Sequence, residues 1–136
     1  MMTGEKKECR NCILVVDDAK IARELETLFL EHAGFEVIEA SDGEEAIEKF
    51  IEFHPVLVIL DLIMPKVSGM VALKKMKKID PTAEILICTA SDDYRVIDLA
   101  LKEGAAGYII KPYRGEELIQ SIRTILSRHG NQGREE

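Results

Sequence analysis

The stretch VLVILDLIMPKVSGM, residues 56–70, joins the pattern of a buried strand to an acid. Its first five residues are all apolar, and Asp61 follows them directly. A short apolar run that does not alternate with polar residues is typical of a strand covered on both faces, as in parallel sheets. We therefore expect residues 56–61 to form a central strand whose end carries Asp61.

The rest of the chain repeats this kind of strand between helices. Runs rich in β-branched residues occur at residues 12–17, 35–40, 84–90 and 107–111. The segments between them have apolar residues at helical spacing, such as Ile21, Leu25, Leu28 and Phe29 in the first. This alternation predicts an α/β protein, with a doubly wound five-stranded parallel sheet and helices on both faces.

Local signals mark where several helices begin and end. Ser41 and Glu44 have the spacing of a capping box ahead of the second helix. Gly34 and Gly104 lie where glycines would end the first and fourth helices. We expect a flexible segment at residues 1–11, one folded domain at residues 12–128 and a flexible tail at residues 129–136.

The composition of the chain argues against several classes of protein. The chain has 136 residues, 25 acidic against 18 basic, and a net charge of -7, which gives no electrostatic reason to bind nucleic acid. Its apolar runs are far shorter than the roughly 18 residues of a membrane span, and its charged start is unlike a signal peptide. Three cysteines do not indicate a secreted disulfide framework. We therefore expect a cytoplasmic protein that binds neither membranes nor nucleic acid.

Polar side chains follow four of the five predicted strands. Asp17 and Asp18 end the first strand, Asp61 the third, Thr89 the fourth and Lys111 the fifth. Because the carboxyl ends of parallel strands meet at one edge of a sheet, these side chains should converge in a crevice there. Three carboxylates in one crevice repel one another, so they should hold a cation or be partly protonated.

The types of side chain indicate the chemistry. Oxygen ligands at an open edge favour Mg²⁺, with Mn²⁺ as an alternative, and the Thr89 hydroxyl and Lys111 ammonium can donate to anionic oxygens. These groups together suggest phosphoryl transfer. Asp61, at the end of the central strand, is the best candidate for a covalent phosphoryl acceptor, whereas Asp17 and Asp18 can approach one metal ion from a single turn.

A set of separated motifs, in its order and spacing, resembles the receiver domain of two-component response regulators. These motifs are Asp17-Asp18, Asp61 with Met64-Pro65 and Gly69, Thr89-Ala90, and Lys111-Pro112. The resemblance covers about residues 12–128. It implies a flavodoxin-like (βα)5 fold that receives a phosphoryl group from a sensor histidine kinase or a phosphotransfer protein. It also implies Mg²⁺ held by Asp17, Asp18, Asp61 and the backbone carbonyl of Ile63.

Further roles follow from the resemblance alone. It implies that the Thr89 hydroxyl follows the phosphoryl group and that the aromatic residue Tyr108 turns inward as a switch. It implies a cis bond before Pro112, in the loop that carries Lys111. Pro65 and Gly69 are interpreted as residues that shape the loop after the acceptor.

The expected function is a phosphorylation-dependent switch that catalyses only its own phosphorylation and dephosphorylation. Phosphorylation would shift the population of two arrangements of the fourth helix, fifth strand and fifth helix, and a partner protein would bind that face. Since no output domain is evident, we expect signalling by protein binding, as in chemotaxis-type or phosphorelay regulators. The chain is expected to be a monomer or a dimer linked to phosphorylation.

Two positions that vary in the family bear on the lifetime of the phosphorylated state. Ile63 lies two residues after the expected acceptor, and Ser91 lies two residues after Thr89. The side chain of Ile63 cannot hydrogen-bond an attacking water molecule. We therefore expect slow self-dephosphorylation.

Three other functions fit less well. A phosphatase with an aspartyl phosphate, of the haloacid dehalogenase kind, needs a second acid where this chain has Ile63. A nucleotide-binding module lacks its glycine-rich motif here. A purely structural receiver would not need all five chemical positions. Cys9 and Cys12 resemble half of a zinc site or a redox pair, but no second Cys or His pair lies at a useful spacing from them.

Overall fold

Five parallel strands form the single sheet of the structure. The computed structural model describes residues 11–64 and 66–134, with side chains described up to residue 128. The strands are β1 (Cys12–Val16), β2 (Glu36–Ala40), β3 (Leu57–Leu60), β4 (Ile85–Thr89) and β5 (Gly107–Ile110). They lie in the order β2-β1-β3-β4-β5, so β3 is central. The predicted fold class and the predicted position of the central strand are confirmed.

Burial along the strands follows this order. Every residue of β1, β3 and β4 is buried, whereas β2 and β5 at the two edges are partly exposed. Residues that are apolar at successive positions can be buried only if helices cover both faces of the sheet. The absence of polar alternation in the three inner strands therefore matches their position.

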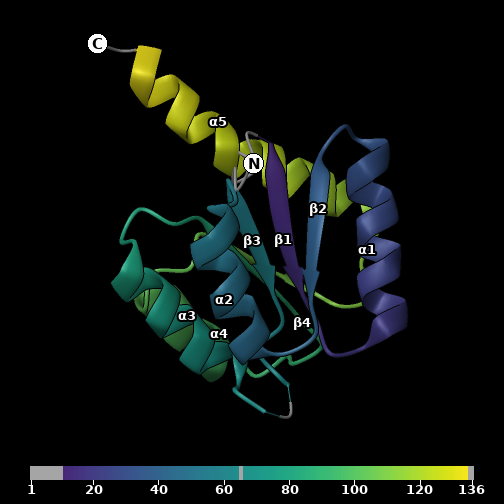
Figure 1. The fold of residues 1–136 in the computed structure, drawn as a ribbon, viewed down its shortest axis with the longest axis vertical. Coiled ribbons are helices and arrows are strands. Elements are labelled where there is room, and N and C mark those ends of the chain that lie inside the picture. The colour runs from purple at the N-terminus through teal and green to yellow at the C-terminus, as the bar shows by residue number, and fades with distance from the viewer. Residues whose placement is uncertain (1–10, 65, 135–136) are drawn as a thin grey trace, which may run out of the picture.

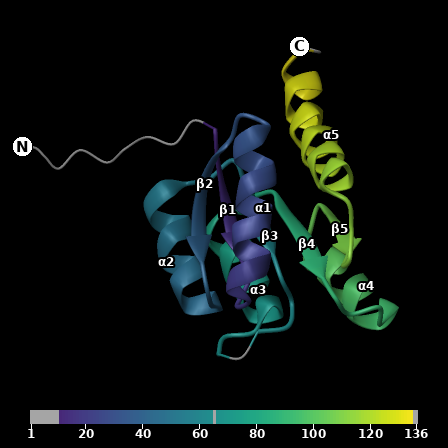
Figure 2. The same cartoon turned by 90° about the vertical axis from the view of Figure 1, so that its right-hand side faces the viewer.

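Five helices provide that cover. They are α1 (Lys20–His32), α2 (Gly43–Phe53), α3 (Gly69–Ile79), α4 (Tyr94–Lys102) and α5 (Gly115–Arg134). Buried residues of α2, α3 and α4 pack on one face of the sheet, and those of α1 and α5 pack on the other. The two views show this layered arrangement, with α2 in front of the sheet in Figure 1 and α1 close to the viewer in Figure 2. The doubly wound arrangement leaves the carboxyl ends of all five strands on one edge.

The apolar residues spaced along α1 divide between the core and the surface, and Phe29 packs against the core. Ile21, Leu25 and Leu28 form an apolar stripe at helical spacing, but they are exposed, and Ile21 is 80% exposed. The buried residues of α1 are Glu26 and Leu30. Spacing identifies a stripe on a helix but not the neighbour that it faces, so an apolar stripe on the surface gives the same pattern as one in the core.

Helix ends largely follow the sequence signals, with one shift. Gly34 and Gly104 have positive φ angles of 98° and 108° just after α1 and α4, as predicted for glycines that end helices. The cap of α2 is Asp42, whose side chain accepts from the backbone N–H of Glu45. Glu45 in turn accepts from the N–H of Ser41. The capping box therefore lies one residue later than the predicted pair, because Asp is as good a cap as Ser.

The last helix extends beyond the predicted domain boundary. The backbone of α5 continues to Arg134, and its later turns extend away from the sheet (Figure 1). Residues 129–134 contain two glycines but no proline, so no residue forces the helix to end at residue 128. Residues 1–10 of the predicted N-terminal segment, including Cys9, lie outside the described residues. Among the described residues, no helix is both long and apolar enough to cross a membrane.

Candidate functional site

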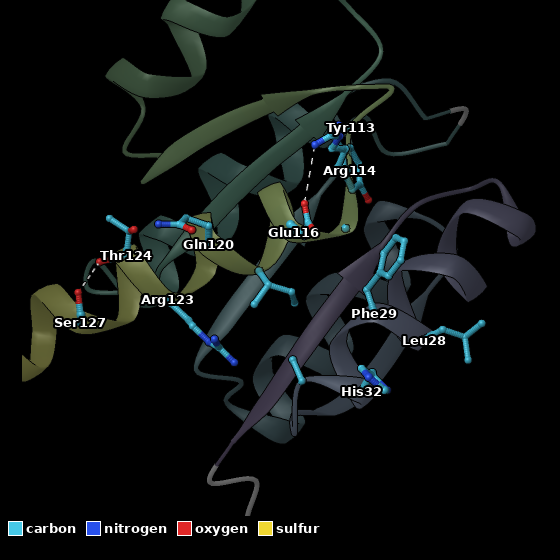
Figure 3. Close-up of a pocket in the computed structure, with 13 residues that line it drawn as sticks. Leu28, Phe29, His32, Tyr113, Arg114, Glu116, Gln120, Arg123, Thr124 and Ser127 are labelled. Atoms are coloured by element: carbon cyan, nitrogen blue, oxygen red, sulfur yellow. Dashed lines mark hydrogen bonds and ion pairs between the residues drawn. The ribbon is translucent and has the colours of Figure 1, made fainter.

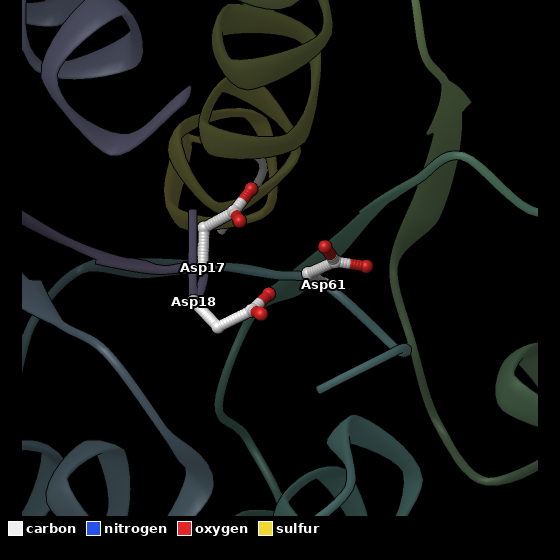
Figure 4. A group of neighbouring side chains, drawn as sticks. All are labelled: Asp17, Asp18 and Asp61. Atoms are coloured by element: carbon white, nitrogen blue, oxygen red, sulfur yellow. The ribbon is translucent and has the colours of Figure 1, made fainter. Parts of the chain in front are cut away.

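Three carboxylates lie together at the carboxyl ends of β1 and β3. Val16 is paired with Leu60 in the sheet, so the next residues, Asp17 and Asp61, are side by side. Asp18 follows on the same turn, and one oxygen from each of the three acids lies within 4.8 Å of the others. Figure 4 shows the three side chains gathered at this edge. The structure thus brings together the acids that the sequence predicted to converge.

The backbone holds two of these carboxylates in place. Asp17 Oδ1 accepts from the N–H of Ala19 at 2.9 Å, and Asp61 Oδ1 accepts from the N–H of Ile63 at 3.1 Å. Arg23 of α1 donates to the backbone carbonyl of Asp17 at 2.8 Å. Both acids are therefore oriented by the turns that follow their strands.

Lys111 reaches the same place from the end of β5. Its Nζ donates to Asp17 Oδ2 and lies 3.4 Å from Asp61 Oδ2. Its backbone N–H donates to the carbonyl of Thr89 at 2.8 Å, and the Lys111–Pro112 bond is cis, as the resemblance implied. Burial lowers the pKa of Lys111, but its hydrogen bond to Asp17 and the charges of Asp61, Asp17 and Glu26 raise it to a larger extent. The ammonium therefore stays charged between the two acids.

Asp61 has the properties of a reactive carboxylate. It is 8% exposed, and this burial raises its pKa; the charge of Asp17 adds to the rise, while the N–H of Ile63 and the charge of Lys111 oppose it. A carboxylate destabilised by burial and by a neighbouring acid gains from any further positive charge. Three convergent carboxylates offer only oxygen ligands, which suits a hard divalent cation. The acidic cluster therefore fits such a cation.

Thr89 and Ser91 connect the crevice to α4. Thr89 is fully buried, and its hydroxyl oxygen accepts from the N–H of Ser91 at 3.3 Å. The hydroxyl of Ser91 accepts from the N–H of Asp93 at 3.2 Å, and Asp93 caps α4 by accepting from Arg95. A displacement of the Thr89 side chain would therefore change the hydrogen bonds at the start of α4.

Gly69 allows the loop after Asp61 to close tightly. Its N–H donates to the carbonyl of Leu62 at 3.1 Å. A Cβ atom at residue 69 would lie 2.1 Å from the backbone oxygen of Asp61 and 2.5 Å from Leu62 Cα. Only glycine fits this approach of helix α3 to the end of β3. Pro65, the other predicted loop residue, lies outside the described residues.

Replacing Gly69 by Ala is expected to lower the free energy of unfolding by about 3 kcal/mol, because the new methyl group meets backbone atoms that cannot rotate away. Urea unfolding measures this change. Gly107→Ala is the matched control, since a Cβ there would meet only Leu86 Cδ1 at an ordinary 3.7 Å. Equal stabilities for the two variants would contradict the steric explanation.

Two predicted residues have exposed side chains. The backbone N–H of Ile63 donates a hydrogen bond to Asp61, but the side chain of Ile63 is 60% exposed. Tyr108 is 42% exposed and does not turn inward in this structure. It lines a groove of about 450 Å³ together with Tyr94, Arg95, Ile97, Asp98 and Leu101 of α4. Tyr108 is thus part of the surface formed by α4 and β5.

A larger groove lies between α1 and α5. Its volume is about 1500 Å³, and its lining includes Phe29, His32, Tyr113, Ile119 and Arg123 (Figure 3). None of the three clustered acids lines this groove. The candidate chemistry therefore lies at the open edge of the sheet and not in the groove between α1 and α5.

Glu26 and Tyr113 were not predicted from the sequence, and they contact each other in the structure. Glu26 is 2% exposed, and Tyr113 donates to it at 2.7 Å. A single acid in a helix gives no signal of burial, because glutamate is common on exposed helical faces. The only hint is that Tyr113 follows Lys111 by two residues.

Comparison with known proteins agrees with this geometry. The family model of the response regulator receiver domain matches residues 13–123. The chemotaxis protein CheY of Bacillus subtilis is 38% identical over 116 residues, which cover 85% of this chain and 97% of that protein.

Solved structures show the same fold. The response regulator protein TrrA of Thermotoga maritima, in complex with Mg²⁺ and BeF, is 36% identical, with a TM-score of 0.78 over 85% of this chain and 98% of that one. CheY in the CheX-CheY-BeF3-Mg²⁺ complex of Borrelia burgdorferi is 27% identical, with a TM-score of 0.83 over 87% of this chain and 90% of that one. With the family match and the acidic edge of the sheet in agreement, the chain belongs to the response regulator receiver domain family.

Proposed function

We propose that this receiver domain is a phosphorylation-dependent switch in which Asp61 accepts a phosphoryl group from the phosphohistidine of a sensor kinase or phosphotransfer protein. The observation that carries the proposal is the placement of Asp61. It lies at the end of the central strand, beside Asp17 and within 3.4 Å of the Lys111 ammonium. A carboxylate in such a position can act as a nucleophile while a neighbouring cation neutralises charge.

The transfer forms one bond and breaks another. An oxygen of Asp61 attacks phosphorus, the bond from phosphorus to the donor nitrogen breaks, and the imidazole keeps the electron pair of that bond. Asp17, Asp18, Asp61 and the backbone carbonyl of Ile63 would hold Mg²⁺ or Mn²⁺, which supplies charge neutralisation when bound. The residues of this chain position the reactants, as expected for a loose transition state.

Lys111 and Thr89 are proposed to stabilise the transferred group. Lys111 already lies against Asp17 and Asp61, so a small movement of its side chain brings the ammonium to a phosphoryl oxygen. The Thr89 hydroxyl can donate its proton, since its oxygen only accepts from Ser91 in this structure. Both groups would favour the phosphorylated state through contacts that form after transfer.

Signalling is proposed to pass from Thr89 to the face made by α4, β5 and α5. The hydrogen bonds from Thr89 through Ser91 to Asp93 link the crevice to the first turn of α4. Tyr108 lines the groove beside that helix and is proposed to change position with Thr89. Phosphorylation then changes the population of two arrangements of this face.

The partners are proposed to be proteins. Ile21 follows Asp18 by three residues and Ile63 follows Asp61 by two, so exposed apolar side chains stand beside the crevice where a phosphodonor must approach. CheY of Borrelia burgdorferi forms a complex with CheX. By analogy, we propose that this chain binds a protein target. It would do so either as a monomer or as a dimer that forms on phosphorylation.

Incubation with acetyl phosphate and Mg²⁺ tests the proposal. Intact-mass measurement is expected to show one added phosphoryl group, and chelation of Mg²⁺ is expected to prevent its addition. Addition at the same rate without Mg²⁺ would contradict the role of the acidic cluster. A protein that gains no mass would contradict the proposed function itself.

Ile63→Asn is expected to speed loss of the phosphoryl group about tenfold, because an amide at this exposed position can orient a water molecule that the apolar side chain cannot. Decay of the phosphorylated protein is followed by intact mass after the donor is removed. Ile51→Asn, the same change at an exposed residue of α2, should decay like the wild type. Equal or slower decay in Ile63→Asn would defeat the idea.

A further inference from the structure

A buried carboxyl group outside the acidic cluster joins three segments of the fold. Glu26 of α1 is 2% exposed, and its Oε2 accepts a hydrogen bond from the Tyr113 hydroxyl at 2.7 Å. The Cys88 thiol of β4 donates to the same oxygen at 3.6 Å. Among the described residues, Glu26 Oε1 has no hydrogen-bond partner. Both donors therefore meet a single oxygen of this side chain.

Packing alone does not explain an acid at this position. The buried layer between the sheet and helices α1 and α5 is otherwise apolar, as residues such as Leu30, Ile59, Leu86 and Ile122 show. Burial raises the pKa of Glu26, whereas its hydrogen bond to Tyr113 and the charge of Lys111 oppose the rise. A carboxyl group with one unpartnered oxygen is costly to bury, so an aliphatic side chain would pack there at lower cost.

The two donors belong to the segments that carry the reactive groups. Cys88 directly precedes Thr89, and Tyr113 follows Lys111 by two residues. The backbone N–H of Lys111 also donates to the carbonyl of Thr89, so the two segments are joined beside the crevice. Tyr113 lies at one end of the groove between α1 and α5, as Figure 3 shows. Glu26 is thus the point at which α1 contacts both segments.

We propose that Glu26 is a positioning residue for phosphoryl transfer, which acts through the Tyr113 hydroxyl to hold Lys111 against Asp17 and Asp61. The inference rests on the proposed function. The hydrogen bond restrains the short segment from Lys111 to Tyr113 relative to α1. Without it the ammonium occupies its productive position for less of the time, which slows the transfer step and leaves donor binding unchanged.

Two substitutions remove this hydrogen bond from opposite ends. Tyr113→Phe keeps the ring and deletes the hydroxyl, and Glu26→Leu deletes the acceptor. With acetyl phosphate and saturating Mg²⁺, each is expected to lower the maximal phosphorylation rate about tenfold. The donor concentration at half-maximal rate should not change. The Mg²⁺ dissociation constant should not rise, because an ammonium that is held less firmly competes less with the cation for Asp17 and Asp61. The melting temperature of Glu26→Leu should be equal to or above that of the wild type, because an apolar side chain replaces a buried acid.

Further variants separate positioning from structure. Glu26→Gln should retain most of the rate, because its amide oxygen can still accept from Tyr113. Glu24→Leu, the matched change at an exposed acid of the same helix, should react like the wild type. The double variant of Glu26→Leu and Tyr113→Phe should be no slower than either single variant, because both delete the same hydrogen bond.

The results distinguish this inference from the proposed function. A wild type that accepts no phosphoryl group overturns both. A wild type that is phosphorylated, with Glu26→Leu and Tyr113→Phe reacting at the same rate, overturns the positioning role alone. A Glu26→Gln variant as slow as Glu26→Leu also overturns it, since the hydrogen bond would then not be what matters.

Discussion

Replacing Asp61 by Asn is expected to abolish uptake of a phosphoryl group from acetyl phosphate. The amide has the shape of the carboxylate and can still accept from the N–H of Ile63, so the loop should keep its conformation. It is a poor nucleophile and cannot form an acyl phosphate by the same route. Intact mass after incubation with donor and Mg²⁺ is the direct measurement, and it should show only the unmodified protein.

The control for this variant is another acid changed in the same way. Asp42 lies outside the three-carboxylate cluster and caps α2. Because Asn caps a helix as well as Asp does, the Asp42→Asn variant should fold and accept one phosphoryl group. If Asp61→Asn gained the same mass as the wild type, the acceptor would be a different residue. Mapping of the modified peptide would then locate it.

Replacing Lys111 by Met is expected to have two opposite effects. The maximal rate of phosphorylation should fall about 100-fold, because one preorganised charged donor to the transferred group is lost. Mg²⁺ should bind more tightly, since the ammonium that contacts Asp17 and lies 3.4 Å from Asp61 no longer competes for these carboxylates. Titration with Mg²⁺ and the rate at saturating donor measure the two effects separately.

Stability gives a second measurement for the same variant. Without Mg²⁺, two buried acids face each other with no cation between them, so the melting temperature of Lys111→Met should fall. Added Mg²⁺ should restore more stability than it adds to the wild type. Lys102→Met, on the exposed surface of α4, serves as the control and should change neither rate nor Mg²⁺ affinity. Weaker Mg²⁺ binding in Lys111→Met would contradict competition between ammonium and cation.

The strands were the most predictable part of the fold. Residues 57–60 are apolar without alternation and are buried on both sides, as their sequence indicated. The stripe on α1 could not be placed in the same way. Ile21, Leu25 and Leu28 have the spacing of a core face, yet they are exposed, because spacing reports the side of a helix and not what lies opposite.

Some features of the candidate site could be predicted from the sequence, and others could not. The convergence of Asp17, Asp18 and Asp61 could be predicted, because parallel strands bring their carboxyl ends to one edge whatever their order. The outward position of Tyr108 could not, since either face of an edge strand can be exposed. Nor could the close approach of Gly69 to Asp61, which depends on where α3 begins relative to the end of β3.

By itself, the sequence determined the alternation of strands and helices and the acids at the strand ends. These follow from patterns within a few residues, where backbone geometry and apolar burial act directly. Only the tertiary structure decided that Lys111 contacts Asp17, 94 residues away, and that Glu26 is buried against Tyr113, 87 residues away. No local pattern records such contacts, because they depend on the packing of whole strands and helices against one another.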